Sequence, residues 1–354
     1  MIKKLLVAIV LLVVAAGGAG YFLYLRVDEP FKGYDADAQD VEIPAGAGTR
    51  AIGRQLVEAG VIRDDLTYRL ALWSTGDARR LKAGEYRFEK PMTPREVLGK
   101  IARGEVDLVN VTFREGLTIA DMAGLFESQG LGTAAAFREA AANPALIAEI
   151  DPAATDLEGY LFPETYAVSR HVQPAQLVKA MVDRFVHVLT PEMREAASAR
   201  NLTVRQLVTL ASIVEKETGA GEERPLVAAV YSNRLRIGMG LQCDPTVIYA
   251  LQRAGRFDGN LRRDDLSFDS PYNTYRYAGL PPGPIAAPGR ASLEAAARPA
   301  DVEYLYFVSR NDGTHAFART LDEHNRNVQK FQVQYFRDKR IAERRKALGE
   351  THAH

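Results

Sequence analysis

The sequence predicts an α+β protein with one N-terminal transmembrane helix, short β-α units and a mainly helical region that carries a β-hairpin. Three observations predict this class. Residues 5–25 form an apolar run without a charged side chain, and the run is long enough to span a bilayer. A strand-turn-helix pattern occurs twice, in residues 41–60 and 111–130. Near the end, Asn311-Asp-Gly313 separates two alternating apolar segments, which is typical of a β-hairpin.

Composition limits the function classes. The chain has 354 residues, 47% of them hydrophobic, which suffices for about two or three domains with a sizeable core. Its 45 basic and 45 acidic residues cancel, so the net charge gives no reason to expect a nucleic-acid partner. Cys243 is the single cysteine and no Cys/His cluster occurs, so we expect no disulfide, no metal and no cofactor. Burial is the simplest protection for a lone thiol in an oxidising compartment.

The apolar run is interpreted as a membrane anchor. Two lysines precede it and Arg26 follows it, so the positive-inside rule places residues 1–4 in the cytoplasm. We therefore expect a single-pass membrane protein whose remaining chain is extracytoplasmic. A cleaved signal peptide is the alternative, because Ala15–Gly20 is rich in small residues. The anchor is favoured because the apolar run resumes in Tyr21–Tyr24, whose aromatic rings suit a membrane interface.

Residues 26–37 are expected to be a linker, and the repeated β-α pattern follows. Each copy has a short strand, a glycine turn, a threonine that can cap, an amphipathic helix and a terminal glycine. Between the copies, residues 81–88 predict another strand, and the segment from Thr93 to Gly104 predicts a helix with both ends capped. This strand-turn-helix arrangement resembles that of LysM modules, which bind glycan chains containing N-acetylglucosamine. Residues 38–110 are assigned to such a module, with a generic α+β scaffold as the alternative.

The rest of the chain predicts mostly helix. Residues 131–200 and 202–252 are helical with breaks, and residues 267–290 form a loop rich in proline and glycine. A charged helix over about residues 321–348 closes the chain, and residues 341–354 are a polar tail.

The most informative segment is the helix predicted over residues 203–218. At about 100° per residue its apolar side chains share one broad face, and Glu215 and Glu217 lie on the two flanks of that face at the helix end. A carboxyl group at the edge of a core loses hydration, so its pKa should rise. A raised pKa is what a general acid for glycoside cleavage needs near neutral pH. A solvated or ion-paired glutamate is the ordinary alternative.

Several stretches carry a family resemblance. They are Ile213-Val-Glu-Lys-Glu-Thr218, Asn233-Arg-Leu-Arg-Ile-Gly-Met239, Leu241-Gln-Cys-Asp-Pro-Thr-Val-Ile-Tyr249, Ser270-Pro-Tyr-Asn-Thr-Tyr275 and Gly279-Leu-Pro-Pro-Gly-Pro-Ile285, supported by Glu158–Tyr166, Tyr304-Leu-Tyr-Phe-Val and His324-Asn325. On these motifs the chain resembles the YceG-like family over nearly its whole length.

The resemblance implies that residues 111–340 are the catalytic region of an endolytic murein transglycosylase. Such a lyase cuts peptidoglycan strands internally, between N-acetylmuramic acid and N-acetylglucosamine, without water. One acid protonates the leaving oxygen and then acts as base on the muramic C6 hydroxyl, which closes a 1,6-anhydro ring. A single carboxylate suffices, unlike the pair of a hydrolase. The resemblance also implies coupling to peptidoglycan synthases, because cutting nascent strands would terminate their elongation.

Glu217 is the expected catalytic acid. Lytic transglycosylases of lysozyme-like type carry a catalytic glutamate followed directly by serine, and Glu217-Thr218 offers a similar acid-hydroxyl pair. Glu215 is followed by a lysine, and we expect it to be a second acid or an orienting group.

A second set of polar and aromatic side chains is expected to contact sugar. It comprises Gln242, Asp244, Asn273, Thr274 and Tyr275. Each has an ordinary alternative: Asp244 precedes a proline and is favoured as a helix N-cap, Asn273 suits a turn, and Tyr275 suits a core. Arg234 and Arg236 are either a solvated helix face or groups that meet peptide-stem carboxylates.

Competing functions remain at this point. A muramidase that uses water would need a second carboxylate across the cleft, for which Asp244 or Glu164 would serve. A catalytically silent wall-binding or division scaffold would also fit the anchor and the LysM-like pattern. His315 and His324 would make a metal pair, but the sequence offers no evident third ligand.

Overall fold

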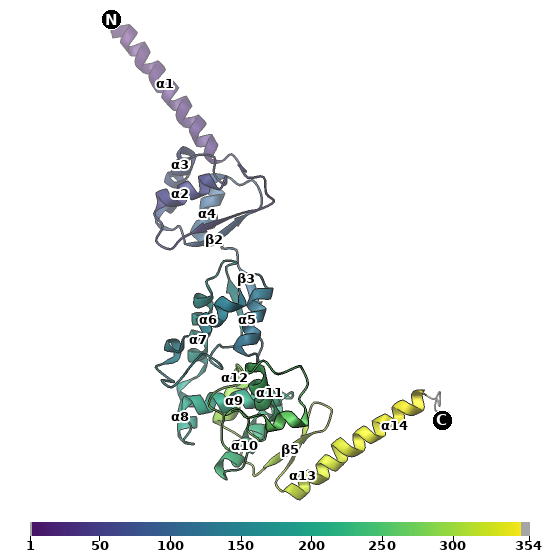
Figure 1. Ribbon diagram of the computed structural model, residues 1–354. Coiled ribbons are helices and arrows are strands. Elements are labelled where there is room, and N and C mark those ends of the chain that lie inside the picture. Colours follow the sequence, from purple (N-terminus) through teal and green to yellow (C-terminus); the bar gives the residue numbers. More distant parts are fainter. Residues whose placement is uncertain (1, 348–354) are drawn as a thin grey trace. The chain divides into compact units, whose positions relative to one another are not determined.

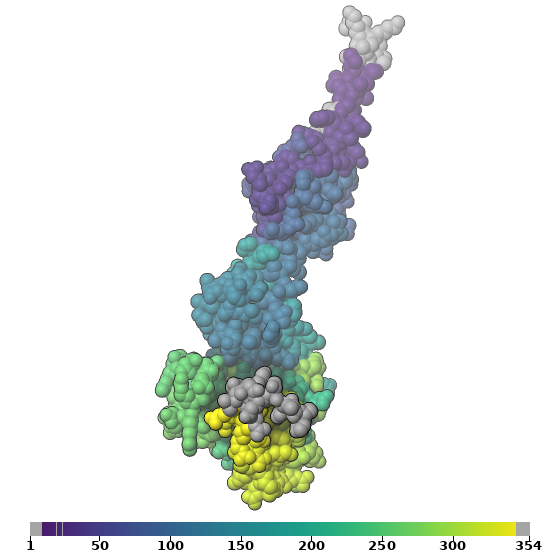
Figure 2. Space-filling view, turned by 90° about the vertical axis from the view of Figure 1, so that its right-hand side faces the viewer, coloured from purple at the N-terminus to yellow at the C-terminus, as the bar shows by residue number. Residues whose placement is uncertain are grey.

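The structure is a computed structural model that describes residues 2–347. It begins with the helix α1 (Ile2–Val27), in which Ile9–Val27 is long and apolar enough to cross a membrane. The large side chains from Ile9 to Val14 are more than half exposed. Figure 2 shows this purple helix standing clear of the domain that follows it. The apolar segment predicted over residues 5–25 is therefore helical.

The chain folds as two compact units. Unit 1 comprises the residues up to Asn110 together with Ala167–Arg170, and unit 2 comprises Val111–Tyr166 and the chain from His171 onward. The strands β3 (Val109–Thr112) and β4 (Thr165–Val168) form a two-stranded sheet, and the unit boundary falls within each of them. Both units mix helices with small sheets, as the sequence predicted (Figure 1).

Unit 1 is built on a two-stranded antiparallel sheet. Its elements are β1 (Gln39–Ile43), α2 (Thr49–Glu58), α3 (Asp65–Thr75), the 3-10 turn η1 (Asp77–Arg79), β2 (Gly84–Phe88) and α4 (Pro94–Arg103). Strand β1 pairs with β2, with Val41 opposite Tyr86. The apolar faces of the strands and helices, together with Val27 at the end of α1, form one core.

The capping predictions in unit 1 are confirmed at one helix and wrong at another. Helix α4 has a capping box between Thr93 and Glu96 and ends at Gly104 in the left-handed conformation, as predicted. Helix α2 instead starts at Thr49, and its N-cap is Gly48, which lacks a side chain to cap with. A glycine can take the extended cap conformation while the threonine enters the helix.

The segment predicted as a linker is fixed to unit 1. The backbone N–H of Phe31 donates to the carbonyl of Met92, and the Tyr34 hydroxyl donates to the carbonyl of Phe88 at 2.8 Å. These bonds tie residues 31–34 to the rest of unit 1, so this stretch does not act as a free spacer.

Unit 2 is mainly helical. Its elements are α5 (Ile119–Ser128), α6 (Ala134–Ala141), η2 (Pro144–Ile147), α7 (Pro174–Val188), α8 (Pro191–Ser198), α9 (Val204–Glu217), η3 (Gly221–Glu223), α10 (Arg224–Arg236), α11 (Asp244–Arg253), η4 (Arg263–Ser267), α12 (Arg290–Ala297), β5 (Tyr306–Ser309), β6 (His315–Ala318), α13 (Leu321–Val328), the π-helical η5 (Gln329–Gln334) and α14 (Tyr335–Ala347). The predicted hairpin is confirmed as the antiparallel pair β5-β6. The predicted closing helix contains a π-helical segment, and residues 348–354 of the predicted polar tail lie outside the described residues.

Helix α9 is the centre of unit 2 and positions the candidate site. A capping box between Thr203 and Gln206 fixes its start, and every residue from Leu207 to Val214 is buried. It packs against α8, α10, α11 and α12 (Figure 1). Because the whole middle of α9 is held by neighbouring helices, its C-terminal turn presents its side chains at a fixed place on the edge of the core.

Candidate active site

Glu217 is the last residue of α9 and has neutral hydrogen-bond partners. Its Oε1 accepts a hydrogen bond from the hydroxyl of the buried Tyr231, on α10, at 2.8 Å. Burial raises the pKa of the Glu217 carboxyl above its ordinary value, and the charge of Asp244 raises it further. The hydrogen bonds from Cys243 and Tyr231 and the charge of His315 oppose this rise. The carboxyl therefore holds a proton more tightly than an exposed glutamate does, while its side chain remains partly accessible.

Glu215 lies in a different environment. Its carboxylate pairs with Arg224 at 3.2 Å and accepts the backbone N–H of Gly289 at 2.9 Å, and only 6% of its side chain is exposed. Gly289 is the N-cap of α12, so Glu215 ties α9 to the start of that helix. A carboxylate held by a guanidinium and a backbone N–H is suited to a structural role.

The hydroxyl beside Glu217 does not pair with it. Thr218 is buried, and its hydroxyl donates to the carbonyl of Val214 at 2.7 Å. This bond satisfies one of the carbonyls left open at the end of α9. The acid-hydroxyl pair expected from the sequence is therefore not formed, because the Thr218 hydroxyl caps α9 instead. The argument for Glu217 that the geometry supports is the loss of hydration of its carboxyl group.

Three of the residues predicted to contact sugar are on the surface. Asp244 accepts a hydrogen bond from the Tyr275 hydroxyl at 2.6 Å, and Gln242 is exposed with a left-handed backbone (φ 50°). The favoured N-cap interpretation of Asp244 is wrong, because Cys243 occupies the cap position and Asp244 is the first residue of α11. Its carboxylate is therefore free to hold Tyr275 near Glu217.

The other two predicted sugar contacts are buried. The Asn273 amide donates to the carbonyls of Leu266 and Phe268, and its oxygen accepts the N–H of Tyr275. Thr274 accepts the N–H of Cys243 at 3.0 Å. Both are at most 1% exposed, so they shape the loop that carries Tyr275 and do not face a ligand themselves.

We expect Asn273→Ala to destabilise unit 2 by about 2–3 kcal/mol, because two buried carbonyls and one N–H lose their partner. Its melting temperature should fall, measured by circular dichroism. Tyr275→Phe is the matched control, since it removes a single hydrogen bond at the surface and should leave the melting temperature within about 2 °C. An unchanged melting temperature for Asn273→Ala with weakened glycan binding would instead restore the direct sugar-contact role.

Sequence reasoning did not single out Tyr231 as a neighbour of the site, and it considered His315 only as one half of a metal pair. Tyr231 is fully buried between α9 and β5, and its ring meets Phe307 edge-on. The His315 ring nitrogen Nδ1 lies 2.6 Å from Glu223, which also accepts the His315 N–H. Both contacts join segments far apart in the sequence, and no local pattern encodes them.

Arg234 is also structural. Its guanidinium donates to the carbonyls of Leu305 and Leu241 at 2.7 and 2.6 Å, which holds β5 and the loop before α11 to α10. The thiol of Cys243 in that loop is 1% exposed, as predicted for a lone cysteine.

His315 and His324 do not form a metal pair, because His324 stacks on Tyr306 while His315 binds Glu223. No cluster of potential metal ligands occurs among the described residues.

Comparison with known proteins agrees with the motif resemblance. A model of the YceG-like family matches residues 41–330. The endolytic murein transglycosylase of Bacillus subtilis (strain 168) is 31% identical over 332 residues, covering 88% of this chain and 90% of that protein. The one from Streptococcus pneumoniae serotype 2 is 31% identical over 365 residues, covering 92% of this chain and 65% of that protein.

A solved structure also matches. The 2.6 Å crystal structure of a yceG-like protein from Listeria monocytogenes aligns with a TM-score of 0.55 and 31% sequence identity, and covers 82% of this chain and 98% of that chain. The resemblance identified from the motifs is thereby confirmed, and the chain belongs to the YceG-like family.

Proposed function

We propose that this protein is an endolytic murein transglycosylase, a lyase that cuts peptidoglycan glycan strands internally. One observation carries the assignment of its acid: Glu217 ends a buried helix with neutral partners that leave its carboxyl able to hold a proton, whereas Glu215 is ion-paired. The names of the bacterial relatives support the reaction class.

In the proposed reaction Glu217 acts twice. Its carboxyl proton moves to the glycosidic oxygen between N-acetylmuramic acid and N-acetylglucosamine as the C1–O bond breaks. The carboxylate then takes the proton of the muramic C6 hydroxyl as that oxygen bonds to C1. The product has a 1,6-anhydro end, Glu217 regains its proton, and no water is consumed. Gln242, Asp244 and Tyr275 are the surface groups placed to contact sugar, and Glu215 orients the helix end.

Product analysis tests the reaction. The full-length protein in detergent should release fragments from purified peptidoglycan that end in 1,6-anhydro-N-acetylmuramic acid, detected by mass spectrometry. Internal cutting should give fragments of many lengths rather than one short unit. Folded protein that binds glycan without releasing any fragment would contradict the lyase and favour a scaffold.

A water-using muramidase is the second candidate, because Asp244 is a carboxylate close enough to Glu217 to raise its pKa. Such an enzyme would give reducing ends that carry oxygen from labelled water. The hydrogen bond from Tyr275 occupies one Asp244 oxygen and favours a positioning role for it.

We also propose the cellular arrangement. Helix α1 anchors the protein in the inner membrane with residues 1–4 in the cytoplasm, and residues 38–110 form a LysM-like module that binds glycan ahead of the catalytic region in residues 111–340. The alternation of strands and helices in unit 1 supports the module. Protease added outside spheroplasts should digest units 1 and 2. Deleting residues 38–110 should weaken co-sedimentation with peptidoglycan.

Nascent strands are the proposed substrate, with peptidoglycan synthases as the neighbouring enzymes whose elongation is terminated by the cut. An anchored enzyme works near the membrane, where new strands appear. Glycan strands should lengthen in cells that carry an inactive variant, and an unchanged length distribution would contradict this role.

A further inference from the structure

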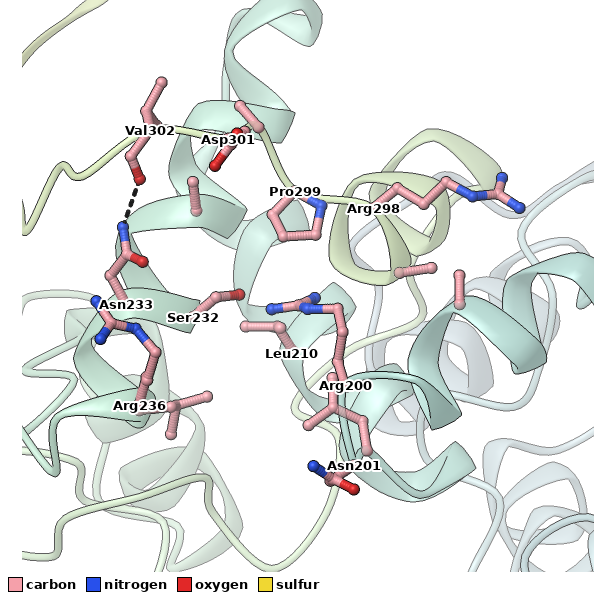
Figure 3. Close-up of a pocket in the computed structure, with 16 residues that line it drawn as sticks. Arg200, Asn201, Leu210, Ser232, Asn233, Arg236, Arg298, Pro299, Asp301 and Val302 are labelled. Carbon is pink, nitrogen blue, oxygen red and sulfur yellow. Dashed lines mark hydrogen bonds between the residues drawn. The ribbon is translucent and has the colours of Figure 1, made fainter.

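Unit 2 contains a cavity whose lining includes neither Glu217 nor its hydrogen-bond partner Tyr231. It has a volume of about 800 Å³ and lies between the turn that precedes α9, the middle of α10 and the segment after α12. Figure 3 shows its lining, with Arg200 and Ser232 directed into the same space on either side of Leu210. The residues that line it include Arg200, Ser232, Arg236, Arg298, Asp301 and Leu210.

Arg200 is a cation without a carboxylate partner. Its guanidinium donates one hydrogen bond, to the carbonyl of Ala296 at 2.8 Å, and no ion pair involves it within the described part of the chain. Burial lowers its pKa below the ordinary value, so the folded chain carries this charge at a cost. A partly buried guanidinium with several free N–H groups is well suited to an anionic oxygen ligand.

Ser232 supplies a second unused group. Its hydroxyl oxygen is buried yet makes no hydrogen bond with any residue between 2 and 347. Buried polar atoms in proteins are normally hydrogen-bonded, so an orphaned hydroxyl that faces a cavity points to a ligand. Arg200 lies in the turn between α8 and α9 and Ser232 lies on α10, so they line the same cavity only because these helices pack together.

The remaining lining selects the kind of ligand. Arg236 adds positive charge at the exposed margin and Asp301 adds a carboxylate that would accept an N–H, while Arg298 donates to the carbonyl of Glu192 and extends away from Arg200 and Ser232. The floor and walls between them are aliphatic, formed by side chains such as Leu202, Leu210, Ala229, Leu235 and Pro299. An inorganic phosphate would fill a small part of this volume and would be repelled by Asp301. A peptide has the required carboxylate, N–H groups and apolar side chains together.

We propose that this cavity binds a peptide whose free carboxylate is held by Arg200 and Ser232. Peptide binding requires no glycan cleavage, so the site is independent of the Glu217 chemistry. If the proposed function holds, the peptide stems of murein are the natural source, and that part of the inference rests on the proposed function.

Isothermal titration calorimetry tests the site, using the full-length protein in detergent. The probes are a sugar-free stem peptide with free carboxylates, the same peptide with its carboxylates amidated, and inorganic phosphate. We expect the free peptide to bind, amidation to weaken binding at least tenfold, and Arg200→Gln to weaken it about 10–100-fold, because a charge-assisted hydrogen bond is lost. Arg194→Gln removes one positive charge from the exposed face of the adjacent α8 and should leave affinity within twofold.

Ser232→Ala separates a ligand contact from a structural role. The hydroxyl has no partner in the protein, so its removal should leave the melting temperature unchanged while weakening peptide binding several-fold. Equal binding by wild type and Arg200→Gln, or no binding of the free peptide, would overturn the proposal. Phosphate binding that depends on Arg200, without peptide binding, would overturn the peptide assignment. Peptide binding by a protein that cuts no glycan would support this peptide site and contradict the proposed function.

Discussion

Glu217→Gln is expected to lower the rate of glycan cleavage by about 10²–10⁴-fold, the range that general acid catalysis contributes. Glutamine keeps the shape of the side chain, and its oxygen can still accept the hydroxyl of Tyr231. It cannot deliver a proton to the glycosidic oxygen. Release of anhydro ends from purified peptidoglycan, followed by mass spectrometry against time, measures the loss. The melting temperature should stay close to that of the wild type.

Glu215→Gln is the matched control, because it makes the same chemical change two residues away. It breaks the pair with Arg224, which is only 17% exposed and keeps Glu115, at 3.6 Å, as its other carboxylate partner. Complete loss of the partner of a buried charge typically costs about 3–5 kcal/mol, so with Glu115 in place this variant should lose less than that, melt earlier and still cut glycan at low temperature. A folded but inactive Glu215→Gln beside an active Glu217→Gln would reverse the two roles.

The pH dependence of glycan cleavage tests the role of Glu217 independently of any substitution. The reaction needs the protonated carboxyl, and burial raises the pKa of Glu217. Activity should therefore persist above the pH at which an exposed glutamate has ionised, and then decline on the alkaline side as the proton is lost. A decline centred near the ordinary glutamate value would show that the desolvation seen in the fold does not act on the reacting group.

Sequence reasoning succeeded where one periodicity controls burial. The apolar face of α9 follows directly from its spacing, and that face places Glu215 and Glu217 at the edge of the core. The same holds for α4, whose threonine, proline and glycine mark its ends, and for the β5-β6 hairpin around Asn311. In these cases a local pattern and the tertiary fold demand the same conformation.

Periodicity does not predict the part of the candidate site that lies outside α9. The loops before α11 and before α12 have no periodicity, so polarity alone suggested that Asn273 and Thr274 face sugar. The structure uses their polar atoms to satisfy backbone groups of a buried loop. The partners that distinguish Glu217 from Glu215 are Tyr231 and Arg224, both on another helix, and their side chains reach α9 only in the folded chain.

Glu158 should make the stability of unit 2 depend strongly on pH. It is 7% exposed beside a cavity of about 410 Å³, where it accepts the N–H of Ile119 and the hydroxyl of Tyr249. Burial raises its pKa from 4.5 to about 8, with a smaller contribution from Asp156, while the hydrogen bonds from Ile119 and Tyr249 and the charge of Arg253 oppose the rise. The folded state thus keeps a proton that the unfolded chain releases.

Proton linkage gives the direction in which the free energy of unfolding changes with pH. Below pH 4.5 both states hold the proton and Glu158 has no pH-dependent effect on stability. Between pH 4.5 and about 8 only the folded state holds it, so the free energy of unfolding falls by about 1.4 kcal/mol per pH unit. At pH 7 the accumulated loss is about 3 kcal/mol, and above pH 8 it no longer grows. Glu158→Gln removes the titration and keeps an oxygen for the Ile119 N–H.

Relative to wild type, Glu158→Gln should therefore gain about 3 kcal/mol between pH 4.5 and pH 7, whatever its stability at the acid end. Native-state hydrogen exchange of the α11 amides measures the difference at each pH. Glu164→Gln is the control: its carboxylate pairs with Arg184 at a surface where 40% of the side chain is exposed, so its contribution should stay below about 1 kcal/mol across the range. A difference between Glu158→Gln and wild type that does not change with pH would mean that Glu158 is ionised inside the fold. The hydrogen bonds from Ile119 and Tyr249 would then outweigh its desolvation.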